Sequence, residues 1–238
     1  MINRRQLLAL ASGFLTLNLF AQEANMKKIL IIGANGKSGS ALVNEALTQG
    51  YEVSAIVRNK EYKNDKLKNI IYKDILAITK EDLADFDIVI SAFAAWTEET
   101  FPLHKKVAEH LRDLLANTKT RLFIVGGAGT LFVDKEMKVR VMDTPEFPAD
   151  WQGVAKATAD SLEVMKNSQN LLWTYVSPAG NYDAEGSRTG KYVLGTDFLI
   201  LNSQNESYIS YADLAVAIID EIKNQKFIQK RFTAITDK

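Results

Sequence analysis

The sequence predicts a single α/β domain built on a parallel sheet with helices on both faces. Three observations predict this fold: aliphatic runs of strand length alternate with helix-like stretches, the connections between them are short over the first half of the chain, and a glycine-rich turn follows the first aliphatic run. A helix between two strands returns the chain to the same end of the sheet, so such strands pair in parallel. A chain of 238 residues can bury one core of this size.

The predicted elements follow in chain order. Residues 29–32 form a continuous aliphatic run that ends in glycine, which is typical of a strand buried on both faces. Residues 38–49 have helical spacing of their apolar side chains and stop at Gly50. Ser210 is expected to cap a late helix, with Asp213 three residues on as in a capping box. Further strands are predicted at 53–57, 70–72, 87–91, 122–125, 173–176, 198–201 and 232–235, and further helices at 100–116 and 154–165.

Two irregular stretches, 127–150 and 178–191, interrupt this alternation. Long irregular segments in a compact domain are usually functional loops. Because open parallel sheets bind ligands at the carboxyl ends of their strands, where the strand order reverses, both loops are expected to cover a ligand there.

Residues 1–25 differ from the rest of the chain and are predicted to be a twin-arginine-like signal segment. Arg4 and Arg5 precede an apolar run at 7–20, which is shorter than a comfortable membrane span. This segment predicts a periplasmic or exported protein whose mature chain has no stable membrane span, and leaves 26–238 as the folded domain. Two alternatives stay open: an uncleaved anchor, or translation from Met26 and a cytoplasmic protein.

Composition excludes several classes of function. Acidic and basic residues balance at 29 each, and no aromatic side chains interleave with the basic ones, so no nucleic-acid partner is predicted. The absence of cysteine excludes disulfides and thiolate chemistry. His104 and His110 are six residues apart on one predicted helix, are expected to face solvent, and predict no metal site. No Gly-x-Ser-x-Gly elbow supplies a hydrolase nucleophile.

The glycine-rich turn is the most informative motif. Gly33, Gly36 and Gly39 follow a predicted strand and open a predicted helix, which is the context of a dinucleotide-binding turn. Gly33 allows the tight turn, Gly36 leaves room for a pyrophosphate at the helix N-terminus, and Gly39 lets the helix pack closely on the strand.

Arg58 indicates which dinucleotide binds. An acid at the end of the second strand would suit the ribose hydroxyl of NAD, but this strand ends at Val57, Arg58 and Asn59. A guanidinium binds the 2′-phosphate of NADP through charge-assisted hydrogen bonds. Lys37 could add a second positive charge within the turn. The sequence therefore predicts NADP(H) in preference to NAD(H).

These motifs resemble the atypical short-chain dehydrogenase/reductases, and within them the NAD(P)H-binding group that includes flavin and biliverdin-IXβ reductases and NADH-flavin reductases. The resemblance rests on KILIIGANGKSGSALVNEALTQGYEVSAIVRN at 28–59 and on shorter stretches at 73–75, 125–129, 188–192 and 209–215. It implies a doubly wound Rossmann-type sheet. It also implies a set of cofactor-binding residues: Gly33, Asn35, Gly36, Lys37, Ser38 and Gly39 at the pyrophosphate, Arg58 at the 2′-phosphate, Asp74 and Ile75 at the adenine, Ser91, Ala92 and Phe93 under the ribose, and Ser177, Pro178 and Ala179 beside the nicotinamide.

The sequence departs from the family at the catalytic pair. Trp151 and Lys156 stand where a Tyr-x-x-x-Lys pair would be expected, with a tryptophan in place of tyrosine and the wrong spacing. The resemblance therefore implies acceptors that take hydride with little help, such as a flavin or a quinone, with flavin as substrate rather than prosthetic group. Tyr182, Lys156 and Tyr192 are candidate proton donors, and Phe93 and Trp96 could stack on an acceptor ring.

Three functions remain open. The first is an NADPH-dependent reductase of a planar, conjugated small-molecule acceptor. The second is a non-catalytic NADP-binding redox sensor, which the missing Tyr-x-x-x-Lys pair favours. The third is an isomerase or epimerase that keeps its cofactor bound.

Overall fold

The computed structural model describes residues 26–237; the predicted signal segment 1–25 lies outside the described residues. The elements are, in chain order, β1 (Lys28–Ile32), α2 (Lys37–Thr48), β2 (Glu52–Val57), β3 (Asn69–Tyr72), α3 (Lys80–Leu83), β4 (Ile88–Ser91), α4 (Leu103–Leu115), β5 (Arg121–Val125), α5 (Gln152–Lys166), β6 (Leu172–Ser177), β7 (Asn181–Asp183), β8 (Val193–Gly195), β9 (Tyr208–Ser210), α6 (Tyr211–Asn224) and β10 (Lys230–Ile235). Short 3₁₀ turns lie at Ile75–Ala77, Ala128–Thr130, Val141–Asp143 and Ala149–Trp151.

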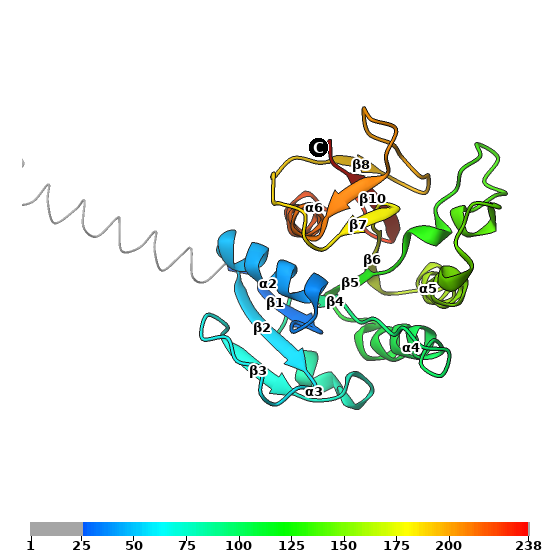
Figure 1. Ribbon diagram of the computed structural model, residues 1–238. Helices are drawn as coiled ribbons and strands as arrows, with labels where there is room; N and C mark the ends of the chain where they lie inside the picture. The colour runs from blue at the N-terminus through cyan, green and yellow to red at the C-terminus, as the bar shows by residue number, and fades with distance from the viewer. Residues whose placement is uncertain (1–25, 238) are drawn as a thin grey trace, which may run out of the picture.

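The large sheet confirms the predicted Rossmann-type α/β fold. Its strand order is β3-β2-β1-β4-β5-β6-β10-β8 (Figure 1). Every neighbouring pair is parallel except β8, which runs antiparallel to β10 at the edge. The chain builds outward from β1 to β3 and then returns to β4 on the other side of β1, so the strand order reverses between β1 and β4. That is the point at which ligands bind in open α/β sheets.

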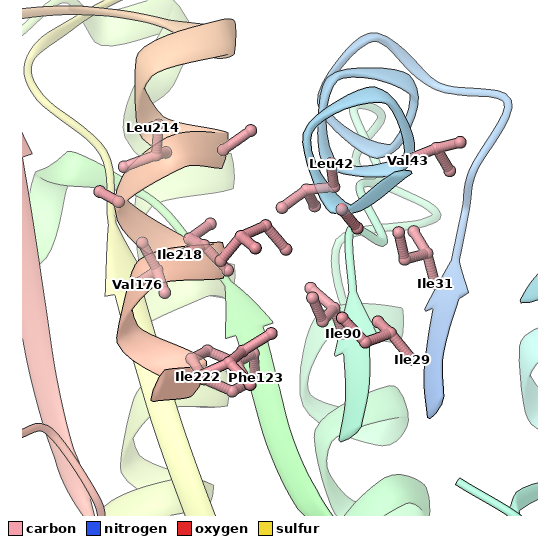
Figure 2. Close-up of a cluster of buried hydrophobic side chains, with 14 of the residues drawn as sticks. Ile29, Ile31, Leu42, Val43, Ile90, Phe123, Val176, Leu214, Ile218 and Ile222 are labelled. Carbon is pink, nitrogen blue, oxygen red and sulfur yellow. The ribbon is translucent and has the colours of Figure 1, made fainter. Parts of the chain in front are cut away.

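One face of the sheet is covered by α2 and α6. The central strands are aliphatic on both faces because helices cover both, and residues 29–31 are completely buried. The two helices lie side by side over the strands in Figure 1, and their apolar faces close one continuous core. Side chains of this core are drawn in Figure 2: Ile29, Ile31, Leu42, Val43, Ile90, Phe123, Val176, Leu214, Ile218 and Ile222.

The opposite face is covered by α4 and α5 (Figure 1). Val107, Ala108 and Leu111 of α4 are spaced to lie on one side of the helix, and they are buried against the second core. Within residues 26–237, no helix combines the length and the apolar character needed to cross a lipid bilayer. The same residues bring together no group of three side chains able to bind a metal ion.

The predicted strand at 198–201 is wrong. Phe198 makes only an isolated bridge to Phe132, and the Leu199 amide donates a hydrogen bond to the Phe132 carbonyl. The apolar side chains of this run contact different parts of the molecule: the Phe198 ring lies 6.4 Å from that of Phe132 in the 127–150 loop, and Ile200 packs against the core under α2 and α6. Strand β8 takes the position at the edge of the sheet. The sequence analysis also missed β7, which lies inside the predicted 178–191 loop and pairs with β9 in a small second sheet.

The late helix begins as predicted, but Asp213 has a different role. Ser210 caps α6 by accepting a hydrogen bond from the Asp213 amide at 2.9 Å. The buried Asp213 carboxylate accepts from the amides of Thr189 and Gly190, both at 2.8 Å. Asp213 therefore ties the 178–191 loop to the start of α6.

Candidate cofactor site

A cleft of about 880 Å³ opens at the carboxyl ends of β1, β2 and β4, where the strand order reverses. Among the residues predicted to bind the cofactor, the following line it: Gly33, Asn35, Gly36, Lys37, Ser38, Arg58, Asp74, Ile75, Ala92 and Phe93. The cleft also receives side chains that the sequence analysis did not assign to it, including Leu103 and Val107 of α4 and Tyr211 of α6.

The glycine-rich turn forms the floor of this cleft. Gly33 has a φ of +81°, a left-handed conformation that favours glycine, and its amide donates to the Ile56 carbonyl at 2.9 Å. A Cβ on Gly39 would collide with the Gly33 carbonyl oxygen. The chain can therefore pass from β1 into α2 only because these two positions lack side chains.

The N-terminus of α2 faces the cleft without a side-chain cap. Gly36 occupies the N-cap position, the first turn contains no acidic residue, and no side chain of residues 26–237 accepts a capping hydrogen bond there. The first amides of a helix need acceptors, and the helix dipole favours a negative charge at this end. The residues present therefore fit a bound diphosphate, which would supply the missing acceptors.

Arg58 differs from the other basic side chains at the cleft. Lys73 pairs with Asp82 at 2.6 Å, and Lys37 lies 3.5 Å from Glu185 in an exposed pair. Arg58 is exposed at the end of β2, lines the cleft, and makes no ion pair or hydrogen bond with any residue of 26–237. Its guanidinium is thus available for an external anion.

The predicted adenine residues lie beyond β3. The Asp74 carboxylate accepts a hydrogen bond from the Leu76 amide at 2.9 Å and thereby caps a short 3₁₀ turn. Ile75 is largely buried but still lines the cleft. Together they form an edge of the cleft against which a flat base could lie.

The segment after β4 forms the other wall. Ala92 and Phe93 line the cleft, whereas Ser91 is buried within the sheet. The prediction that His104 faces solvent is wrong: its ring packs edge-on against Phe93 with 5.4 Å between centroids. Its Nε2 lies 3.2 Å from the Ala95 nitrogen and 3.1 Å from the Ala95 oxygen. Burial lowers the pKa of His104, although the hydrogen bond with Ala95 opposes this.

His110 is also not a solvated side chain. It is partly buried, and its Nε2 lies 2.9 Å from the Ile78 carbonyl oxygen. Helix α4 reaches the segment that follows β3 through this contact.

The segment predicted to border the nicotinamide is not part of the cleft lining. Ser177 is the last residue of β6, Pro178 and Ala179 follow it, and all three are buried. The Ser177 hydroxyl is buried without a hydrogen-bond partner among residues 26–237. The contact of these residues with the nicotinamide stays a prediction.

The three candidate proton donors lie outside the cleft lining. The Tyr182 hydroxyl is 2.9 Å from the Ser38 hydroxyl, its ring lies 3.7 Å from that of Tyr211, and burial raises its pKa. Tyr192 donates to Asp220 at 2.8 Å, and burial and this carboxylate raise its pKa. Lys156 is exposed on α5. The structure therefore groups Tyr182 with the phosphate end of the cleft and separates the other two from it.

The 178–191 loop is attached to helix α2 as well as to α6. Arg188 donates to the buried Glu45 carboxylate at 2.7 Å, and this hydrogen bond lowers the pKa of Glu45. With the contact between Tyr182 and Ser38, it holds the loop against the helix that begins at the glycine-rich turn. No local sequence pattern predicts these contacts, because their partners are more than a hundred residues apart.

The fold and the site define a dinucleotide-binding protein of the Rossmann class, and comparison with known proteins identifies its family. The sequence profile of an NAD(P)H-binding family matches residues 33–225. The chain belongs to this family, within the atypical short-chain dehydrogenase/reductase-like NAD(P)H-binding group that the motifs predicted.

Three relatives illustrate the similarity. YwnB of Bacillus subtilis, an uncharacterised protein, is 41% identical over 211 residues, which cover 88% of this chain and 99% of YwnB. The crystal structure of SP1627 from Streptococcus pneumoniae, described as a "putative NADH-flavin reductase", has a TM-score of 0.85 at 44% identity and covers 89% of this chain and all of SP1627. A "putative exported protein" from Burkholderia pseudomallei has a TM-score of 0.76 at 33% identity, again over 89% of this chain and all of that protein.

Proposed function

We propose that this protein is an NADPH-dependent reductase that passes hydride to a planar, conjugated acceptor such as a flavin or a quinone. The observation that carries the cofactor choice is Arg58, a guanidinium at the end of β2 that lines the cleft and has no ionic partner among residues 26–237. An unpaired guanidinium at this position suits the 2′-phosphate of NADP. The name of SP1627 supports reductase chemistry, although it refers to NADH.

The chain's own residues would bind and orient the reactants. The free amides at the start of α2 would bind the diphosphate, and Arg58 would bind the ribose phosphate. When bound, NADPH supplies a hydride, which the acceptor takes together with a proton from water to give its two-electron-reduced form and NADP⁺. Phe93 and Trp96 would exclude water on the acceptor side. A proton from water is consistent with the missing Tyr-x-x-x-Lys pair.

The cofactor choice can be tested by comparing the dissociation constants of NADPH and NADH. A charge-assisted contact contributes about 1.5–3 kcal/mol, so Arg58→Ala should weaken NADPH binding by about tenfold or more and leave NADH binding nearly unchanged. Arg112→Ala is the matched control, because Arg112 pairs with Asp113 on the surface of α4. Equal losses for both nucleotides would contradict NADP selection by Arg58.

Turnover separates the reductase from the redox sensor. We expect NADPH oxidation, followed at 340 nm, with riboflavin, FMN, menadione and dichlorophenolindophenol as acceptors. Micromolar NADPH binding without turnover of any of these acceptors would favour the sensor. Nucleotide that stays bound through purification would favour the isomerase or epimerase.

We also propose export for the full chain, because residues 1–25 have the layout of a twin-arginine-like signal and a similar protein is described as exported. Mass spectrometry of the chain recovered from the periplasm would show a mature N-terminus near residue 25. A chain that starts at Met26 and is found only in the cytoplasm would contradict export.

A further inference from the structure

Two exposed tryptophans contact each other beside the cofactor cleft, and one of them, Trp96, lines it. Trp96 is 62% exposed and Trp151 is 52% exposed, whereas the third tryptophan, Trp173, is buried. The two indoles are 6.0 Å apart between ring centroids and nearly perpendicular, with an interplanar angle of 89°. Large aromatic surfaces left in water at one place commonly mark a binding site.

The loop that carries Trp96 is held in place from two sides. His104 contacts both the amide and the carbonyl of Ala95, the residue before Trp96. The amide of Thr97, the residue after Trp96, donates to the Thr100 hydroxyl at 3.1 Å. Trp96 therefore lies in a turn whose backbone is fixed by hydrogen bonds on both sides of it.

Trp151 is brought to this turn by the first residues of α5. A Cβ on Gly153 would collide with the ring of Phe101, so only glycine lets the helix approach the segment that follows Trp96 so closely. The side chain of Gln152, the residue after Trp151, donates a hydrogen bond to the Met142 carbonyl at 2.9 Å and so attaches the start of α5 to the 127–150 loop. Both indoles are thus pre-organised, which lowers the cost of ordering them when a ligand binds.

We infer that Trp96 and Trp151 form the acceptor subsite and that this subsite binds an uncharged planar ring. The inference rests on the proposed reductase function. Trp96 lines the same cleft as Ala92 and Phe93, so a ring resting on its indole would continue the space predicted for the cofactor. Two perpendicular indoles can contact a flat ring with the face of one and the edge of the other.

The charges near the two indoles select against anionic acceptors. Glu98, Glu99 and Asp150 lie within three residues of an indole and are exposed, and no lysine or arginine lies within that span. Lys156, five residues after Trp151, is exposed on α5, and no cation–π contact within residues 26–237 involves Trp96 or Trp151. Arg58 and Lys37 line the cleft from the end of β2 and the start of α2, whereas Trp96 follows β4. The phosphate of FMN would meet carboxylates here, whereas riboflavin or an uncharged quinone would not.

Riboflavin and FMN test the inference because they differ only by the phosphate. With the full-length protein, the KM for riboflavin should be about tenfold lower than that for FMN, the change that 1.4 kcal/mol produces. Trp96→Ala and Trp151→Ala should each raise the KM for riboflavin by roughly three- to tenfold, as expected for a lost aromatic contact, while the Kd for NADPH stays unchanged. A triple variant that carries Glu98→Gln, Glu99→Gln and Asp150→Asn should show a smaller difference between the KM for riboflavin and the KM for FMN.

Leu172→Ala is the control for removing an exposed apolar side chain, because Leu172 lies at the amino end of β6, away from the cleft. If both tryptophan variants still reduce riboflavin and neither changes the KM for riboflavin, the inferred subsite is wrong, but the proposed reductase function is not contradicted. In a second outcome, no acceptor is reduced, but riboflavin quenches the tryptophan fluorescence and Trp96→Ala abolishes this quenching. This result would support the ring-binding subsite and contradict the proposed reductase function. If riboflavin does not quench and both substitutions instead dissociate an oligomer in sedimentation, the indoles are a protein interface and the inference is overturned.

Discussion

The half of the sheet that contains the glycine-rich turn and the half that carries the long loops are stabilised by different interactions. Around β1, β2 and β4, backbone hydrogen bonds and aliphatic packing define the turn: Gly33 donates to Ile56, Gly36 donates to Gly33 at 3.0 Å, and Ala92 donates to Ile32 at 3.0 Å. The turn is therefore determined by residues that need no specific side-chain partner.

Around β5, β6 and β10, buried arginines connect distant segments. Arg121 on β5 donates to Glu221 of α6 at 2.6 Å and to Thr174 of β6 at 2.7 Å. Arg231 on β10 donates to the carbonyl of Thr130 at 2.9 Å and to Asp197 at 2.9 Å, which holds the 127–150 loop and the segment after β8 to the sheet. The comparison shows that the glycine-rich turn depends on backbone geometry, whereas the half that carries the long loops depends on long-range polar pairs.

Breaking a buried ion pair should have the largest effect on the free energy of unfolding. Glu221→Ala leaves the Arg121 guanidinium, 5% exposed, without its carboxylate, which should lower the free energy of unfolding by about 3–5 kcal/mol. Urea denaturation measures this loss. Asp113→Ala removes an exposed pair with Arg112 and should cost less than about 1 kcal/mol. Equal losses in the two variants would contradict the importance of buried pairs in this half.

The glycine turn should respond to added volume. Gly39→Ala places a methyl group against the Gly33 carbonyl, which should cost about 1–3 kcal/mol of stability and abolish measurable NADPH binding in calorimetry. Gly50→Ala is the control: Gly50 has a φ of +80° but open space around it, so alanine there should cost about 1–2 kcal/mol through backbone strain alone. Unchanged NADPH affinity in Gly39→Ala would show that the turn does not bind the nucleotide.

Tyr182 links the two regions, and its removal should have a moderate effect. Tyr182→Phe keeps the ring against Tyr211 but removes the hydrogen bond with Ser38, so NADPH should bind more weakly by about 0.5–1.5 kcal/mol, which is roughly two- to twelvefold. Tyr192→Phe also removes a hydroxyl from this part of the molecule, but its partner is Asp220, so NADPH affinity should not change. If both variants bind NADPH as the unmodified protein does, Tyr182 does not position Ser38.

The smallest predicted effect is a pH dependence that arises at His104. Burial lowers its pKa below the ordinary value of 6.5, so the folded protein keeps this imidazole neutral under conditions in which the unfolded chain binds a proton. The stability that depends on the neutral ring is present above pH 6.5 and is lost as the pH falls through the lowered pKa. Urea unfolding at pH 7.5 and pH 5.5 measures the free energy of unfolding at each pH. Between these two values, this free energy should fall less in His104→Gln than in the unmodified protein. His110→Gln, on the same helix, is the control, and an identical acid loss in all three proteins would contradict this role of His104.

Much of the fold was predictable because its signals are local. The aliphatic run of β1, the glycines that follow it and the Ser210 cap of α6 each occupy a few consecutive residues, and all three were confirmed. The errors fell where one local pattern fits two environments. The apolar run at 198–201 resembled a strand but makes only an isolated bridge to Phe132, and the imidazole of His104 resembled a solvated side chain but contacts Ala95, the residue before Trp96.

The candidate site divides in the same way. The glycine-rich turn and Arg58 were recognisable because an NAD(P)H-binding strand–turn–helix unit favours particular residue types at fixed positions, and the contact of Arg58 with a phosphate stays a prediction. The pairing of Trp96 with Trp151 was not recognisable, because the two residues are brought together only when α5 packs against the segment after β4.

The sequence by itself determined the parallel α/β sheet, its dinucleotide turn and the basic residue at the end of β2, since each depends on the order and type of neighbouring residues. Only the tertiary structure decided which side chains meet: Tyr182 with Ser38, Arg188 with Glu45, and the two exposed indoles. The physical reason is that short stretches of chain determine the backbone conformation and the burial pattern. A contact between distant segments depends instead on how whole helices and loops pack.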